Sequence, residues 1–128
     1  SMDDSGPQTL ELVTDGSYCY EPGFALLSYV ESEMTGLEGV VTSFRIEDGQ
    51  TVTLRRTGKV NAEMVFDRRQ AHESLYDVGF GAMMISVVTE DMTVLLNEHG
   101  GVLDLDYRVE VEHALCSRNR YHIEIQTI

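Results

Sequence analysis

The sequence predicts an all-β protein, an antiparallel up-and-down barrel of about eight to ten strands. Apolar and polar residues alternate with a period of two over most of the chain, which is typical of strands with one dry and one wet face. Strand-like segments also follow one another about every 8–12 residues. Such a series leaves two unpaired edges unless it closes on itself, and this favours a barrel.

The clearest alternation lies near the C-terminus, in residues 102–112. Leucine, tyrosine and valine side chains occupy one face of this segment, and Asp, Arg and Glu occupy the other. Residues 120–128 repeat the pattern, so we expect a hairpin with its loop at 116–119 and with Val111 opposite Ile123.

Seven further strands are expected upstream, at 24–32, 40–47, 51–56, 60–67, 73–79, 81–89 and 93–98. The Asp48-Gly49 pair between two of them is a strong hairpin signal. No stretch reads as a convincing helix, since glycines interrupt the best candidate at 29–39. The alternation predicts a bulky interior made of Phe44, Leu54, Met64, Phe66, Met83, Ile85, Leu103, Leu105, Tyr107 and Ile123.

The composition indicates one acidic globular domain over residues 1–128, with residues 1–8 as a disordered or tag-derived N-terminus. The 22 Asp and Glu residues against 9 Lys and Arg give a formal charge of −13. This charge argues against nucleic-acid and anionic-membrane partners, because both carry negative charge. No apolar run reaches the length of a membrane span, and two cysteines without metal-ligand spacing predict a reducing, cytoplasmic location.

Five of the nine basic residues lie within residues 53–69. The alternation places Arg56 on the inner face with Val52 and Leu54, near the barrel rim, while Arg55 points to water. An inward guanidinium is costly unless it is paired. Three outcomes are therefore open for Arg56: an internal carboxylate or carbonyl partner that fixes the barrel, a bound anion, or an open rim in contact with solvent.

The anion-binding alternative gives the candidate site. Guanidinium binds carboxylate or phosphate through a planar fork of donors. A small hydrophobic or anionic amphiphile would therefore meet Arg56 with helpers from the same interior. The candidate ligand-binding residues are Arg56, Tyr76, Tyr107, Tyr121, Tyr29 and Phe66. The rest of the basic stretch reads as surface ion pairs, although the same alternation puts Arg68 beside Met64 and Phe66.

Catalytic and metal chemistry find little support in the sequence. The predicted hairpin places His113 inside and His122 outside, so the two histidines cannot share a metal. Cys116 near His113 is weak support for a nucleophile, and strand carboxylates are expected on the wet face. We therefore expect a non-catalytic protein without a cofactor.

An ordered set of residues resembles the YwiB-like family of small uncharacterised bacterial proteins. The set comprises Arg56-Thr57-Gly58, Phe66, Tyr76 and Phe80-Gly81, with upstream similarity in residues 14–20 and 26–50. The resemblance implies a lipocalin-like (calycin) β-barrel and no particular reaction. Arg69 departs from it, since a small turn residue is expected there.

Members of that family usually carry one more strand before residue 9, which implies an exposed sheet edge here. An exposed edge recruits strands from another chain. The alternative function is therefore a protein-interaction or homodimerisation module with a barrel filled by side chains.

Overall fold

The computed structural model describes residues 2–3, 6–7, 9–77 and 81–128, with side chains from residue 9 onward. The expectation for residues 1–8 falls partly outside this range, as does Phe80 of the family resemblance. The elements are β1 (Met2–Asp3), β2 (Gly6–Pro7), β3 (Ser17–Glu21), β4 (Phe24–Val30), the 3₁₀ turn η1 (Glu33–Thr35), β5 (Val41–Glu47), β6 (Thr51–Thr57), β7 (Asn61–Asp67), β8 (His72–Asp77), β9 (Ala82–Asn97), β10 (Gly100–Val111) and β11 (Ala114–Gln126).

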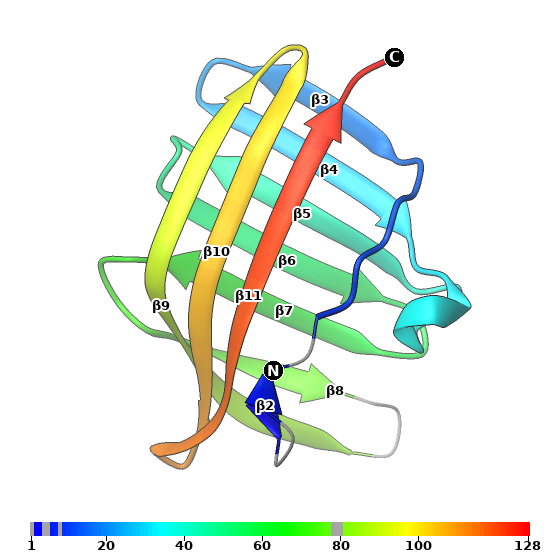
Figure 1. The fold of residues 1–128 in the computed structure, drawn as a ribbon. Helices are drawn as coiled ribbons and strands as arrows, with labels where there is room; N and C mark the ends of the chain where they lie inside the picture. The colour runs from blue at the N-terminus through cyan, green and yellow to red at the C-terminus, as the bar shows by residue number, and fades with distance from the viewer. Residues whose placement is uncertain (1, 4–5, 8, 78–80) are drawn as a thin grey trace.

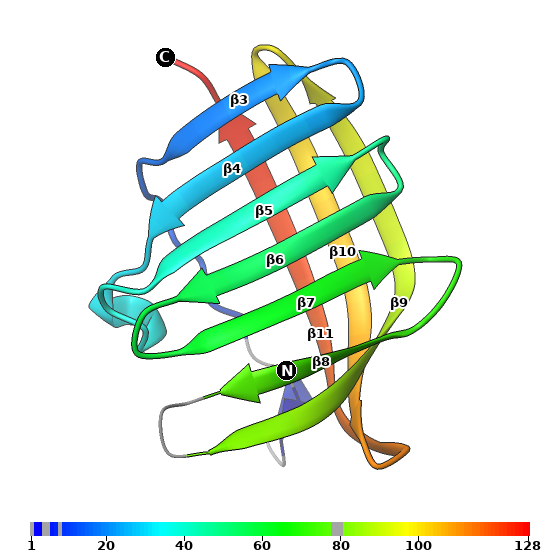
Figure 2. The same ribbon diagram turned by 180° about the vertical axis from the view of Figure 1, so that it is seen from behind.

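Strands β3 to β11 form one antiparallel sheet in strict sequence order. The sheet curls so that β3–β7 make one layer and β9–β11 make a second layer that crosses it (Figures 1 and 2). This up-and-down order confirms the predicted all-β class, and the curled sheet is a half-barrel that fits a lipocalin-like barrel. The 3₁₀ turn η1 is the one helical element among the described residues.

The long strand β9 belongs to both layers. Its first part, residues 82–87, pairs with β8, and residues 86–97 pair with β10. The pairing with β10 shifts by one residue at Glu90, between the pairs Asp106–Asp91 and Tyr107–Thr89. A bulge of this kind bends a strand without ending it. The expected break at 90–92, between the strands 81–89 and 93–98, is therefore wrong, because the bulge takes the place of a turn.

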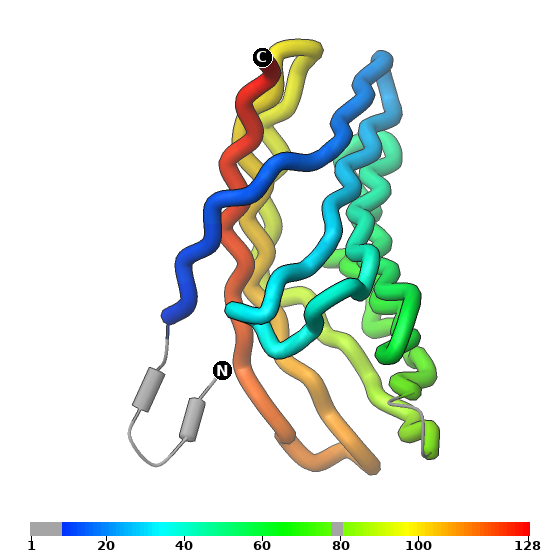
Figure 3. Tube along the Cα trace, turned by 90° about the vertical axis from the view of Figure 1, so that its right-hand side faces the viewer, coloured from blue at the N-terminus to red at the C-terminus, as the bar shows by residue number. Residues whose placement is uncertain are grey.

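The sheet does not close on itself through strand pairing. Within residues 9–77 and 81–128 no ladder joins β3 to β11, so each of them is an edge strand. One side-chain bond spans this seam, from the Tyr18 hydroxyl to the carbonyl of Asn97 at the end of β9, at 2.7 Å. Figure 3 shows the segment before β3 running from the side of β11 across to the layer of β3.

The space between the layers is filled by large apolar side chains. Phe44, Phe66, Val52, Leu103 and Leu105 are completely buried, as the alternation predicts. The residues expected in the interior are buried or partly buried, with the exception of Met83, which is 47% exposed. Met83 lies near the start of β9, where it pairs with Tyr76 of β8, and the adjacent Met84 is exposed as well.

The C-terminal hairpin turns earlier than expected. Strand β10 ends at Val111 and β11 begins at Ala114, so Glu112 and His113 form a two-residue turn with φ of 53° and 65°. Val111 consequently faces Ala114, and Ile123 faces Leu103. The predicted loop at 116–119 and its register are wrong because neither turn residue is Gly or Asn, the usual markers of two positive φ angles.

Candidate functional site

Arg56 lies in a row of residues that crosses the first layer. The strand registers place Tyr29 beside Thr42, Thr42 beside Arg56, Arg56 beside Ala62, and Ala62 beside Tyr76. Directly paired residues point to the same face of a sheet. The row therefore brings two of the predicted tyrosines to the inner side with Arg56.

The second layer supplies the direct partner of Arg56. Its Nη2 donates a hydrogen bond to the Tyr121 hydroxyl on β11, at 2.6 Å. Arg56 is partly buried, and its Nε is fully buried with no hydrogen-bond partner among the described residues. A buried donor without a partner on a charged group is costly and calls for an explanation.

Aromatic rings form a continuous chain from Tyr121 into the core. Tyr107 and Tyr121 stack with ring centroids 6.2 Å apart. Phe66 packs edge-on against Tyr107 at 4.7 Å, and Phe44 packs edge-on against Tyr121 at 5.6 Å. Phe66 is completely buried, so a direct contact between its ring and a ligand would require Tyr107 to move.

Glu31 is a member of this cluster that the sequence reading missed. Its carboxylate is 5% exposed and accepts hydrogen bonds from Thr42 at 2.6 Å and from Thr35 at 3.2 Å. Thr35 is held there by η1, which is capped by the Ser32 side chain. The sequence does contain a signal for the inner position of Glu31. It follows Ala25, Leu27 and Tyr29 at intervals of two residues, so it lies on the same face of the chain as they do.

The electrostatics of the cluster favour a charged Arg56. Burial opposes the charge, but Tyr121, Tyr76 and the Glu31 carboxylate outweigh it and raise the pKa of Arg56. Burial, reinforced by the charge of Glu31, raises the pKa of Tyr29 well above its usual range. Burial likewise raises the pKa of Tyr107 and of Tyr121, although Arg56 opposes both shifts. The cluster therefore combines the Arg56 cation and the Glu31 carboxylate with several neutral tyrosine hydroxyl groups.

The direct partner of Arg56 differs from those expected from the sequence. An internal carboxylate, Glu31, does lie within electrostatic reach, yet none of the ion pairs among the described residues joins the two side chains. The direct partner is a tyrosine hydroxyl instead. The Nε donor of the guanidinium therefore has no hydrogen-bond partner among the described residues.

Two other residues of the basic stretch, Arg55 and Arg69, form local ion pairs. Arg55 points outward and binds Glu63 through Nε and Nη2, at 3.1 and 2.6 Å. Asp67 is 4% exposed and accepts three hydrogen bonds from Arg69. The expectation that Arg68 shares the inner face is wrong, because β7 ends at Asp67 and Arg68 lies exposed in the following turn.

Asp67 and Glu31 also correct the expectation that strand carboxylates lie on the wet face. The bonds from Arg69 hold the pKa of Asp67 far below its usual range, despite the opposing effect of burial. Arg69 further reaches Gln50 and Thr51 on the neighbouring hairpin. Arg69 thus occupies a turn position where a small residue was expected, because its side chain binds the buried carboxylate of Asp67.

Other reactive side chains do not gather into a site. His113 lies exposed in the β10–β11 turn, not on the inner face, and His122 bonds Asp104 and Glu124 outside the sheet. Cys19 and Cys116 are both exposed free thiols. Over residues 9–77 and 81–128 no group of three metal-ligating side chains is placed to hold an ion. The same part of the chain contains no helix of the length and hydropathy needed to cross a membrane.

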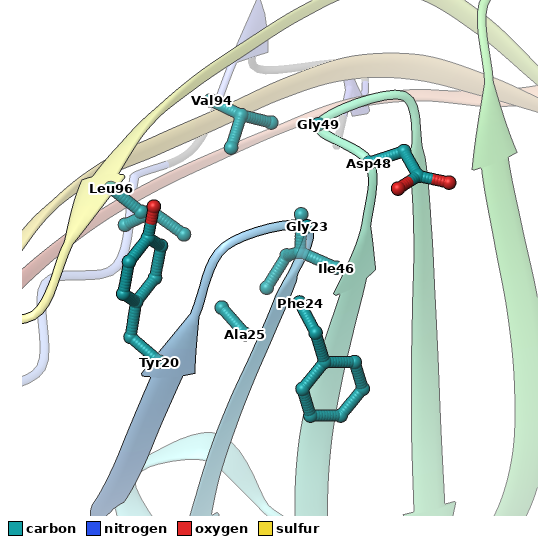
Figure 4. Close-up of a pocket in the computed structure, with 9 residues that line it drawn as sticks. All are labelled: Tyr20, Gly23, Phe24, Ala25, Ile46, Asp48, Gly49, Val94 and Leu96. Carbon is teal, nitrogen blue, oxygen red and sulfur yellow. The ribbon is translucent and has the colours of Figure 1, made fainter.

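Two clefts lie at the opposite end of the sheet from Arg56. The larger, of about 400 Å³, opens between the β3–β4 and β5–β6 turns and strand β9 (Figure 4). The other, of about 340 Å³, adjoins the β5–β6 turn and Arg68. Arg56 lines neither of these two clefts, so its chemistry and not their volume defines the candidate site.

Comparison with known proteins agrees with this architecture. The profile of a domain of unknown function, DUF1934, matches residues 1–123. The chain belongs to the DUF1934 family. The crystal structure of the ywiB protein from Bacillus subtilis superposes on this DUF1934 domain with a TM-score of 0.72 and 26% identity, over 84% of this chain and 75% of that one. The predicted YwiB-like resemblance is thereby confirmed. No curated protein matches this DUF1934 domain.

Proposed function

We propose that this protein is a non-catalytic binding protein that takes the carboxylate or phosphate group of a small amphiphile at Arg56. The observation that carries the proposal is the guanidinium itself. It lies partly buried between the two layers, donates to Tyr121 at 2.6 Å, and keeps a buried Nε without a partner among the described residues. An anionic oxygen is the group that such a donor set prefers.

The neighbouring side chains suit the rest of such a ligand. Tyr29, Tyr76 and Tyr121 are partly buried, so each combines an apolar ring with a hydroxyl near the cation. The core below them is filled, so the hydrocarbon part of the ligand would lie along the tyrosines at the end of the half-barrel and not inside it. Glu31 lies nearby and weakens the attraction for an anion, so we expect a modest affinity.

Thermal unfolding with a ligand series tests this proposal. Octanoate and octyl phosphate should raise the melting temperature, since a ligand at about 100 times its Kd stabilises a protein by about 2.7 kcal/mol. The variant Arg56→Gln should remove the shift. Its matched control is Arg55→Gln on the same strand, which loses only an outward pair with Glu63.

Two outcomes would contradict the proposal. The first is that octanoate or octyl phosphate stabilises Arg56→Gln as much as it stabilises the wild type. The second is that calorimetry detects no binding of either anion to the wild type up to its solubility limit. Unfolding of each variant without ligand provides the baseline, so that a loss of stability is not mistaken for a loss of binding.

The open edges favour a second candidate function, a strand-pairing interaction module. Strands β3 and β11 each lack a partner on one side among the described residues, and β11 offers 13 residues for pairing. Edges of this kind accept a strand from another chain. Light scattering coupled to size exclusion tests for a homodimer, and a monomer at high micromolar concentration would count against it.

A further inference from the structure

We propose that the 400 Å³ cleft at the turn end of the half-barrel is a second binding site, and that it takes a small amphiphile carrying an amine. The cleft is separated from Arg56 by the filled core, so it does not depend on the function proposed for that residue. Its volume lies within the ~300–1,000 Å³ of ligand pockets in general.

The cleft has an apolar interior. Ala25 and Ile46 form a floor that is almost fully buried, and Val94 and Leu96 of β9 form the facing wall (Figure 4). The two walls come from different layers, which separate at this end. A hydrocarbon chain placed between them would cover apolar surface on both sides, and this burial favours binding by about 25 cal/mol per Å².

The charge of the lining selects the polar group. Asp48 is the one ionisable residue other than tyrosine that lines the cleft, and its carboxylate lies at the outer rim, directed away from the apolar walls (Figure 4). The lining contains no Lys, Arg or His. Tyr20 adds a hydroxyl on the other side (Figure 4). An amine at the mouth would meet Asp48 within a protein of charge −13, whereas a carboxylate there would be repelled.

The geometry of the two turns keeps Asp48 in place. Its backbone N–H donates to the carbonyl of Gly23 at 2.9 Å, which ties the β5–β6 turn to the β3–β4 turn. Asp48 has a φ of 54°, a conformation that Asn also tolerates. Asp48→Asn therefore removes the charge while it retains the turn, which makes it a specific test of the electrostatic part of the proposal.

The experiment compares three probes of equal chain length: octylamine, octanol and octanoate. We expect octylamine, and more weakly octanol, to shift the NMR amide signals of Gly23, Val94 and Leu96, which line this cleft and not the adjoining one. Octanoate should leave these three signals in place, although it is expected to act at Arg56. Asp48→Asn should weaken octylamine binding about 2- to 5-fold, as for a solvent-exposed ion pair, and leave octanol unchanged.

The neighbouring residue provides the control. Glu47 carries the same charge but pairs with Arg45 and does not line the cleft, so Glu47→Gln should leave octylamine binding unaltered. Equal octylamine affinity in Asp48→Asn and wild type, or shifts of the cleft signals by octanoate, would overturn the proposal. Shifts confined to signals away from the cleft would also overturn it. A failure of octanoate at Arg56 would leave these outcomes untouched, so the two proposals are tested separately.

Discussion

Arg56 and Tyr121 join the two layers of the half-barrel through one hydrogen bond of 2.6 Å between residues 65 positions apart in the chain. One partner is charged and both are partly buried, so the bond belongs to the stronger kind. We predict that Tyr121→Phe lowers the free energy of unfolding by about 1–3 kcal/mol, because it leaves a second guanidinium donor unsatisfied. Urea unfolding measures this change.

A double-mutant cycle isolates the pair from the packing of the ring. Tyr121→Phe introduced into Arg56→Met should cost less than Tyr121→Phe in the wild type, since no guanidinium then remains to be satisfied. Equal costs in both backgrounds would show that the hydroxyl stabilises the protein through some other contact.

Asp67 and Arg69 make a second testable pair at the opposite end of the sheet. Asp67→Asn should reduce stability by about 1–3 kcal/mol at pH 7, since it removes a buried charged acceptor of three bonds. The folded-state pKa of Asp67 is lowered, so the unfolded state takes up the proton first as the pH falls. The contribution of Asp67 is therefore complete above its ordinary pKa of about 4 and is lost progressively below it.

Urea unfolding at several pH values distinguishes this explanation from a packing defect. The stability difference between wild type and Asp67→Asn should shrink between about pH 4 and pH 2. A difference that stays constant over this range would contradict the assignment of a charged Asp67 in the folded protein.

His122 should show the opposite pH dependence. Bonds to Glu124 and Asp104 raise the pKa of His122 above its ordinary value. Its contribution to stability is then present below about pH 6.5 and is lost as the pH rises through the folded-state pKa. An NMR titration of the His122 ring protons should give a higher pKa in wild type than in Asp104→Asn. Equal titration midpoints for His122 in the two proteins would contradict the conclusion that Asp104 raises the pKa of His122.

Gly101 marks a position where the chain tolerates no side chain. It has a φ of 136°, and a Cβ there would lie 1.9 Å from the carbonyl oxygen of Leu95 on the neighbouring strand. We predict that Gly101→Ala lowers the free energy of unfolding by more than 1 kcal/mol, through both strain and displacement of β9. Gly81→Ala is a matched control, since Gly81 has open space around it and an ordinary φ. A stability loss in Gly101→Ala no larger than in Gly81→Ala would contradict this.

Alternation was sufficient to predict the fold and the inner position of Arg56. Each strand of the first layer keeps one apolar face, so the parity of Val52 and Leu54 fixes the direction of Arg56. The same parity places Tyr29, Tyr107 and Tyr121 toward the interior. The strand registers then bring these residues together, which the sequence could only suggest, because no local pattern determines which inner residues of distant strands meet.

The errors occurred where a strand departs from regular alternation. The Glu90 bulge preserved β9 across a polar stretch that looked like a turn. The Glu112–His113 turn uses two residues that seldom adopt positive φ. Asp67 follows Phe66 into the interior at the end of β7, so two adjacent residues are buried. In each case a backbone irregularity or a long-range bond outweighs the two-residue period.

The bend in β9 has a consequence for how the molecule could be divided. The first part of β9 pairs with β8 and the second part pairs with β10. A break in the chain on either side of Glu90 would therefore remove a paired strand from one of the two layers. Neither fragment would then retain a complete hydrophobic face. Because the two layers bury their apolar faces against each other, truncation within β9 should destabilise both of them.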